Sequence, residues 1–166
     1  GEQIAALRKG TIDLALLGNA RLILSREFFV RRIALVSVFA ALPESHPLAA
    51  QSTLRLADLR AELFVGARDR DLPGHNQWII QLCRRARFRP TFVLEAESLT
   101  HSLATIVAEG AVDLLPEYAT KLRVPGVTYR PLRDASATCE LLLAWQRGKL
   151  STPVRAMLEL LPVARL

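Results

Sequence analysis

The sequence predicts a mixed α/β fold, and three observations lead to that prediction. Apolar runs of strand length alternate with amphipathic stretches of helix length along the 166 residues. Glycines and prolines stand at the ends of several of these stretches, where helices and strands are expected to stop. Hydrophobic residues make up 51% of the chain and charged residues 23%, which is enough to support a packed core. The alternation itself favours parallel strands covered by helices.

The N-terminal part of the chain is predicted to hold two helices and two strands, with an apolar run between them. Gly10 stands where the C-terminal cap of a first helix belongs, and Pro43 stops the apolar run. In order, we expect a helix over residues 3–9, a buried strand over 12–17, the long apolar run over 33–42, a short helix over 52–59, a strand over 63–66 and a charged loop over 67–74.

The C-terminal part begins with the best amphipathic helix, over residues 75–87, which Pro90 is expected to end. A second helix over 99–109 has Ser98 as its expected N-cap and Gly110 as its C-cap. Strands are expected at 91–95, 112–115, 127–130 and 138–145, and a last helix at 152–161. The residues expected to face inward are Trp78, Ile79, Leu82, Cys83 and Ala86 in the first helix, and Leu99, Leu103, Ile106 and Val107 in the second.

The net charge of +6 and the pI of about 10.1 raise the question of nucleic acid binding. The positive charge is nearly all arginine and is scattered, apart from one cluster at Arg84, Arg85, Arg87 and Arg89. Aromatic residues do not interleave with the basic ones as they do in single-strand binders, and no zinc-finger or RNA-recognition signature occurs. We therefore expect no sequence-specific DNA binding by this chain.

Motif analysis favours neither a membrane protein nor an enzyme. No apolar run approaches the roughly 20 residues of a membrane helix, and no secretory signal pattern opens the sequence, so a cytoplasmic setting is expected. The two cysteines and three histidines lack metal-ligand spacing, and the cysteines are expected to be buried thiols. No nucleophile elbow, phosphate loop or dinucleotide fingerprint occurs. We expect no catalytic residue, no metal and no cofactor.

Six stretches, in order, resemble the regulatory domain of LysR-type transcriptional regulators. His46 lies in one of them, a turn motif in which we expect it to have a structural role. The stretches are QIAALRKGTIDLAL at 3–16, LPESHPLA at 42–49, LADL with LFV at 56–65, LCRRARFRP at 82–90, IVAEG with LP at 106–116, and LLLAW with STPV and ML at 141–158. Together they cover nearly the whole chain.

The resemblance implies a two-lobed fold like that of type 2 periplasmic binding proteins, with two crossover strands and a small-molecule cleft. Lobe I would comprise residues 1–37 and the return segment 137–166, and lobe II residues 38–136. The first strands of lobe I in the family have no counterpart before Gln3, nor does the DNA-binding domain. DNA would be contacted only through that absent domain. The resemblance also implies a homo-oligomer that packs through the helix at 75–87.

Two departures from the family pattern are local. Arg87 stands where the family has a glycine, so the helix before it is expected to end differently. The run from Gly110 to Pro116 is one residue shorter than usual, with Val112 or Asp113 near the second glycine of the family pattern. The strand register there is left open.

The expected ligand is a small organic anion, a carboxylate, held at helix N-termini. Unpaired backbone N–H groups and the helix dipole favour an anion at such positions. The candidate effector-binding residues are Ala67, Arg68 and Asp69 in the charged loop, and Ser98, Leu99 and Thr100 at the start of the second helix. Arg68 and Arg70 add positive charge. Ser98 has two open roles, capping alone or ligand contact.

Two other classes of function share the implied fold. One is a solute-binding protein of a transporter, against which the missing export signal and the HPLA turn count. The other is an enzyme such as an acid–base lyase or transferase, for which no acid, base or phosphate loop is identified. Fold alone does not decide between a sensor domain and these alternatives.

Overall fold

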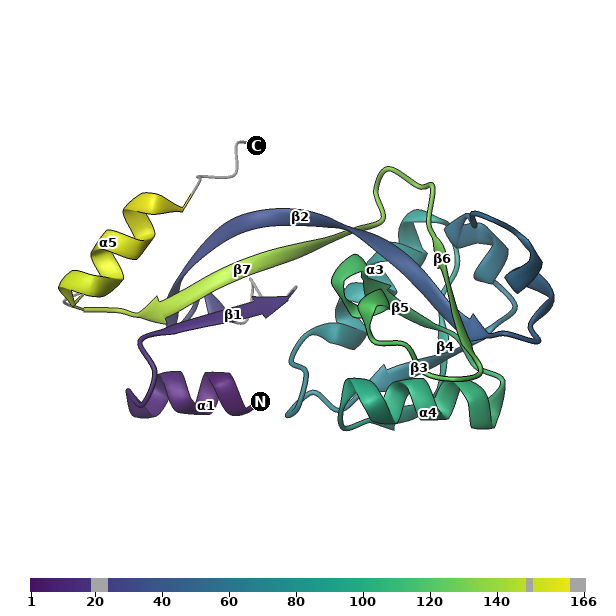
Figure 1. Cartoon of the computed structure of the whole chain (residues 1–166), viewed down its shortest axis with the longest axis horizontal. Coiled ribbons are helices and arrows are strands. Elements are labelled where there is room, and N and C mark those ends of the chain that lie inside the picture. Colours follow the sequence, from purple (N-terminus) through teal and green to yellow (C-terminus); the bar gives the residue numbers. More distant parts are fainter. Residues whose placement is uncertain (19–23, 149–150, 162–166) are drawn as a thin grey trace. The chain divides into compact units, whose positions relative to one another are not determined.

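The computed structural model describes residues 1–18, 24–148 and 151–161, which form a mixed α/β structure (Figure 1). The fold class predicted from the sequence is confirmed at this level. The elements are α1 (Glu2–Lys9), β1 (Leu14–Gly18), β2 (Phe28–Pro43), the 3-10 helices η1 (Pro47–Ala50) and η2 (Leu56–Leu59), β3 (Leu63–Ala67), α3 (His75–Arg85), β4 (Thr91–Ala96), α4 (Leu99–Glu109), β5 (Asp113–Pro116), the 3-10 helix η3 (Glu117–Lys121), β6 (Val127–Pro131), β7 (Thr138–Gln146) and α5 (Thr152–Leu160).

The chain divides into two compact units. Unit 1 consists of Gly1–Leu35 and Glu140–Leu166, and unit 2 is the continuous segment Val36–Cys139. Both β2 and β7 contribute residues to each unit. The predicted return segment 137–166 includes residues 149–150 and 162–166, which lie outside the described residues. None of the helices in the described ranges is both long and apolar enough to span a membrane.

Three neighbouring strands of unit 2, β3, β4 and β5, are parallel to one another. β3 pairs with β4 in parallel, with Ala67 opposite Ala96. β3 also lies beside β5 through a parallel bridge between Phe64 and Val112. The prediction of parallel sheets is wrong for the other pairs, since β1–β7, β2–β5 and β2–β6 are all antiparallel. The helices α3, between β3 and β4, and α4, between β4 and β5, provide the crossovers that these parallel neighbours require.

The helices α3 and α4 pack into separate apolar clusters of unit 2. Residues of α3 pack with Phe64 and Leu114, and residues of α4 pack with Val65 and Leu115. Successive strand residues point to opposite faces, so the two helices cover opposite faces of these strands. The buried residues of α3 are Trp78, Ile79, Leu82 and Cys83, as predicted, with Ala86 half-buried. In α4 the prediction is wrong for Val107, which is 47% exposed.

The predicted helix over 75–87 ends early, at Arg85, and Pro90 is not what ends it. Arg87 adopts the left-handed conformation with φ 63°. The backbone N–H of Phe88 reaches back to the carbonyl of Cys83 at 3.1 Å. This is the closing turn that glycine usually makes, formed here by arginine.

The predicted helix over 52–59 is also wrong in extent, because η2 covers only its last four residues. His46 is the N-cap of the preceding 3-10 helix η1, and its Nδ1 accepts from the N–H of Leu48 at 3.2 Å. Its Nε2 lies 3.1 Å from Glu62 Oε2. The ring therefore joins two segments of unit 2, which confirms its structural role.

Unit 1 is built from both ends of the chain. β1 pairs with β7, with Leu14 opposite Trp145. Ile4 and Leu7 of α1 pack in one apolar cluster, and Val154 and Leu158 of α5 pack in another; both include residues of β7. Gly10 takes the left-handed conformation expected of a helix C-cap, with φ 69°.

Candidate functional site

The two groups of predicted site residues lie at the carboxyl ends of neighbouring strands. β3 ends at Ala67 and β4 ends at Ala96, which face each other in the parallel register. The N–H of Arg68 donates to the carbonyl of Ala96 at 3.0 Å. The structure thus brings the loop that starts at Ala67 next to the segment that leads into α4. This is the edge at which open α/β sheets bind ligands.

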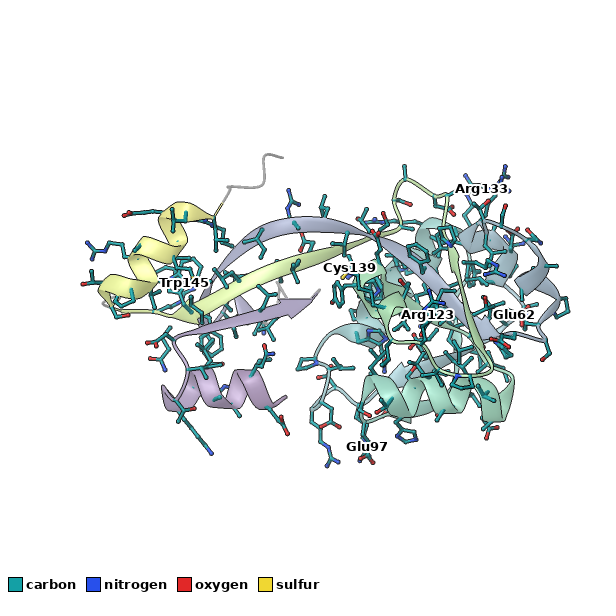
Figure 2. The ribbon with its side chains drawn as sticks, in the orientation of Figure 1. Glu62, Glu97, Arg123, Arg133, Cys139 and Trp145 are labelled. Carbon is teal, nitrogen blue, oxygen red and sulfur yellow. The ribbon has the colours of Figure 1, made fainter. Side chains whose placement is uncertain are left out.

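Most polar groups of the loop that follows β3 are already in hydrogen bonds or ion pairs. The N–H of Ala67 donates to Asn76 Oδ1 at 2.7 Å, and Asp69 Oδ1 accepts from the N–H of Gly74 at 3.0 Å. The guanidinium of Arg68 forms an ion pair with Glu97 and lies 3.8 Å from Asp71. Figure 2 shows Glu97 at the start of α4. The charge expected of Arg68 is therefore balanced by two carboxylates.

The start of α4 keeps free donors. Ser98 Oγ accepts from the N–H of His101 at 3.2 Å, which confirms Ser98 as the N-cap. The same Oγ lies 3.0 Å from Thr100 Oγ1. Within the described residues, the backbone N–H groups of Leu99 and Thr100 have no acceptor. Two amides and the hydroxyl hydrogen that the Ser98–Thr100 bond does not use are therefore available to an anion at this helix start.

The start of α3 is less open than the sequence suggested. Gly74 precedes the helix with φ 81°, and its N–H is held by Asp69. The N–H of His75 donates to the carbonyl of Leu72 at 3.2 Å. Of the two helix starts proposed for an anion, α4 is the better supplied with free donors.

The sequence analysis missed Tyr118, which lies just beyond the carboxyl end of β5. Because β5 runs parallel to β3, its end at Pro116 belongs to the same edge as Ala67 and Ala96. The side chain of Tyr118 is half exposed, and its partial burial, followed by the proximity of Cys139, raises the pKa of the phenol. The hydroxyl is therefore neutral near pH 7 and able to donate. No motif marks this tyrosine in the sequence.

Asp113 was also missed as a polar centre, although its position was noted as a departure from the family pattern. It is 1% exposed. Its carboxylate accepts from Ser102 Oγ at 2.6 Å and from the N–H of Leu114 at 2.7 Å, and lies 3.5 Å from His75 Nε2. In the part of the chain that the structure describes, no three His, Cys, Asp or Glu side chains are grouped to hold a metal ion.

Comparison with known proteins identifies the family. The LysR substrate binding domain profile matches residues 1–164. The chain is 32% identical over 136 residues to the HTH-type transcriptional regulator BudR of Raoultella terrigena, covering 82% of this chain and 47% of that protein. It is 34% identical over 131 residues to the transcriptional dual regulator GltC of Bacillus subtilis, covering 76% and 41%. The chain thus spans about half the length of the curated relatives it matches.

Solved structures of low sequence identity share the fold. An effector-binding domain of a BenM variant aligns with a TM-score of 0.80 at 21% identity, covering 95% of this chain and 73% of that one. The BenM effector-binding domain with its effector benzoate aligns with a TM-score of 0.72 at 19% identity, covering 95% and 71%. Full-length CbnR complexed with its target DNA aligns at 0.77 and 20% identity, covering 95% and 55%.

The matched family is one of regulatory, non-enzymatic domains, which removes the enzyme alternative. With the family profile covering residues 1–164, the chain belongs to the LysR substrate binding domain family, the effector-binding part of LysR-type transcriptional regulators.

Proposed function

We propose that this chain is the sensor half of a cytoplasmic, DNA-binding LysR-type regulator, and that its α4 start binds a small organic anion. The family assignment carries the sensor role. The free amides of Leu99 and Thr100, beside the hydroxyls of Ser98 and Thr100, support the ligand charge. The ligand would regulate transcription if it binds one conformation better than another, because only differential affinity shifts such an equilibrium.

The lobes and crossover strands that the family resemblance implies are part of the proposal. We propose that units 1 and 2 are the two lobes and that β2 and β7 are the crossover strands. Support comes from the residue assignment, since β2 and β7 each begin in one unit and end in the other. The self-association surface would include α3, and DNA would be contacted by a separate N-terminal domain of the whole protein.

The contacts described above change how much each candidate residue is expected to contribute to ligand binding. Ser98, Leu99 and Thr100 become the principal contacts. Arg68 is a weaker one, because an incoming carboxylate would have to compete with Glu97 and Asp71. Ala67 and Asp69 are proposed to shape the loop, since their polar groups are bonded to Asn76 and Gly74. Tyr118 is added as a neutral donor at the same edge.

The experiment is calorimetry of the full-length protein with benzoate and a set of related carboxylates. Replacing Ser98 and Thr100 together by Ala is expected to weaken binding at least about tenfold, equivalent to about 1.4 kcal/mol. The matched control is the pair Ser151→Ala and Thr152→Ala at the start of α5, where Ser151 makes no side-chain cap bond. Equal affinity in the α4 double variant would remove these residues from the site, and an uncharged or cationic effector would refute the anion.

A further inference from the structure

Asp113 places a carboxylate inside unit 2 where an apolar side chain would pack more simply. Its neighbours along the strand, Val112 and Leu114, are fully buried apolar residues. Both oxygens of Asp113 are engaged, Oδ2 by Ser102 Oγ at 2.6 Å and Oδ1 by the N–H of Leu114 at 2.7 Å. Burying a carboxylate is unfavourable unless it is paired and hydrogen-bonded. Asp113 meets this requirement, and its partners show which elements the carboxylate connects.

The partners of Asp113 come from the first turns of two helices. Ser102 belongs to the first turn of α4, and its own N–H donates to the carbonyl of Ser98 at 2.9 Å. His75 is the first residue of α3, and its Nε2 lies 3.5 Å from Asp113 Oδ1. The two helices otherwise pack into separate apolar clusters on opposite faces of the strands. Asp113 is therefore a polar junction between two helix starts that share no apolar cluster.

The junction continues along α3. The ring of His75 lies against the indole of Trp78, with centroids 5.6 Å apart. The indole N–H of Trp78 donates to the carbonyl of Thr138, the first residue of β7, at 3.1 Å. A line of contacts thus leads from Ser102 through Asp113, His75 and Trp78 to the beginning of β7. Each of these contacts lies within unit 2.

We propose that Asp113 is a positioning residue that holds the first turns of α3 and α4 in one fixed arrangement. Its hydrogen bonds go to Ser102 and to the N–H of Leu114, and it acts on the site through Ser102 and His75. Its relevance to effector binding rests on the proposed function. The mechanical link between the two helix starts does not depend on that function, and it can be measured without a ligand.

The test is amide hydrogen exchange in Ser102→Ala. This change removes the hydroxyl on α4 that bonds to Asp113. If the link exists, hydrogen exchange becomes faster on α3, on the other face of the strands. The amide to follow is that of Trp78, which donates to the carbonyl of Gly74. We expect about threefold or faster exchange there, because loss of a bond to a charged group loosens the turns it holds. The matched control is Thr105→Ala, also buried on α4, whose hydroxyl donates to the carbonyl of His101 in its own helix.

Global destabilisation has a different signature. It would raise exchange throughout unit 2, so the amides of β2 serve as an internal reference. Faster exchange at Trp78 relative to β2 in Ser102→Ala and in Asp113→Asn, but not in Thr105→Ala, supports the link. Unchanged exchange at Trp78, or equal changes in all three variants, overturns it. Asp113→Asn retains the size of the side chain, which limits disturbance of the packing.

A spectroscopic readout addresses the same point. In a Trp145→Phe background, Trp78 is the remaining tryptophan of the chain. Asp113→Asn is expected to change its emission, because His75 loses the carboxylate that holds its ring against the indole, while Thr105→Ala leaves the emission unchanged. Identical spectra for all variants would count against the junction. The benzoate affinity of the Ser98 and Thr100 double variant is a separate measurement. A failure of the effector proposal therefore does not change the result for the Asp113 junction.

Discussion

The N–H of Phe88 donates to the carbonyl of Cys83 across a turn in which Arg87 has φ 63°. A side chain with a Cβ is strained in the left-handed conformation, and glycine is not. The bond between Phe88 and Cys83 therefore holds a local geometry that the sequence at position 87 does not favour.

Replacing Arg87 by Gly is expected to raise the free energy of unfolding by about 1 kcal/mol. The side chain of Arg87 is exposed, so little packing is lost. Urea unfolding measures the change. The control is Arg84→Gly in the last turn of α3, which is expected to lower stability by roughly 1 kcal/mol. Loss of stability in Arg87→Gly would show that the arginine makes a compensating interaction.

Ser98 allows capping to be separated from ligand contact. Ser98→Ala removes the acceptor for the His101 N–H and is expected to lower the free energy of unfolding by about 1 kcal/mol. Ser98→Asp retains a capping oxygen and is expected to keep stability close to that of the unaltered protein. Its negative charge would repel a carboxylate ligand. Retained stability together with lost binding of the carboxylate ligand in Ser98→Asp is the result that the anion site predicts; retained binding would contradict it.

Gly66 is fixed by close neighbours rather than by its backbone angles. A Cβ at this position would lie 3.2 Å from Asn76 Oδ1 and 3.2 Å from Phe92 Cδ1. Gly66→Ala is expected to displace Asn76 from the N–H of Ala67 and to lower stability by about 1–3 kcal/mol. Combining it with Asn76→Ala should cost less than the sum of the single changes, because both remove the same bond. Strict additivity in thermal unfolding would mean that Asn76 does not move.

Cys83 is expected to be inert in the folded protein. It is fully buried, and burial raises the pKa of its thiol to about 12. Thiol titration near pH 8 should find no reaction before unfolding and two reactive cysteines after it, since Cys139 is buried as well. Reaction of Cys83 in the folded state would show that this part of α3 opens readily.

The same burial predicts a pH dependence of stability. The unfolded thiol loses its proton near its ordinary value of 9.0, while the folded thiol keeps it until about pH 12. The unfolded state then binds fewer protons, so the free energy of unfolding falls as pH rises from about 9 to 12. Cys83→Ala is expected to show a shallower decline over that window in urea unfolding experiments. Parallel curves for the two proteins would contradict the shift.

Local signals in the sequence predicted most elements of the fold. Gly10, Ser98 and Gly110 mark helix ends correctly because caps depend on a few neighbouring residues. The prediction that Val107 faces inward was wrong, because the inward face of α4 is set by its contacts with β3 and β4. Periodicity alone does not specify those contacts. The antiparallel pairs were missed because the alternation of elements does not encode strand direction.

The candidate site was predictable in place but not in detail. Parallel strand ends meet at one edge, which is why the segments after Ala67 and Ala96 were expected together. The bond from Ala67 to Asn76 and the ion pair between Arg68 and Glu97 depend on how the loops fold back, and no spacing rule gives them. Asp113 meets His75 through tertiary packing between residues far apart in sequence.

The two units differ in how they can form during synthesis. Unit 2 is one continuous segment, whereas β1 of unit 1 must wait for β7, a partner about 130 residues further along the chain. Closing so long a loop in an unfolded chain is entropically unfavourable, and prior folding of the segment between would shorten it. The segment that holds α1 and β1 would therefore be among the last parts of unit 1 to complete its sheet, and the apolar cluster around Ile4 and Leu7 would lack Ala144 of β7 until then. Chaperone dependence should accordingly concentrate in the segment that holds α1 and β1.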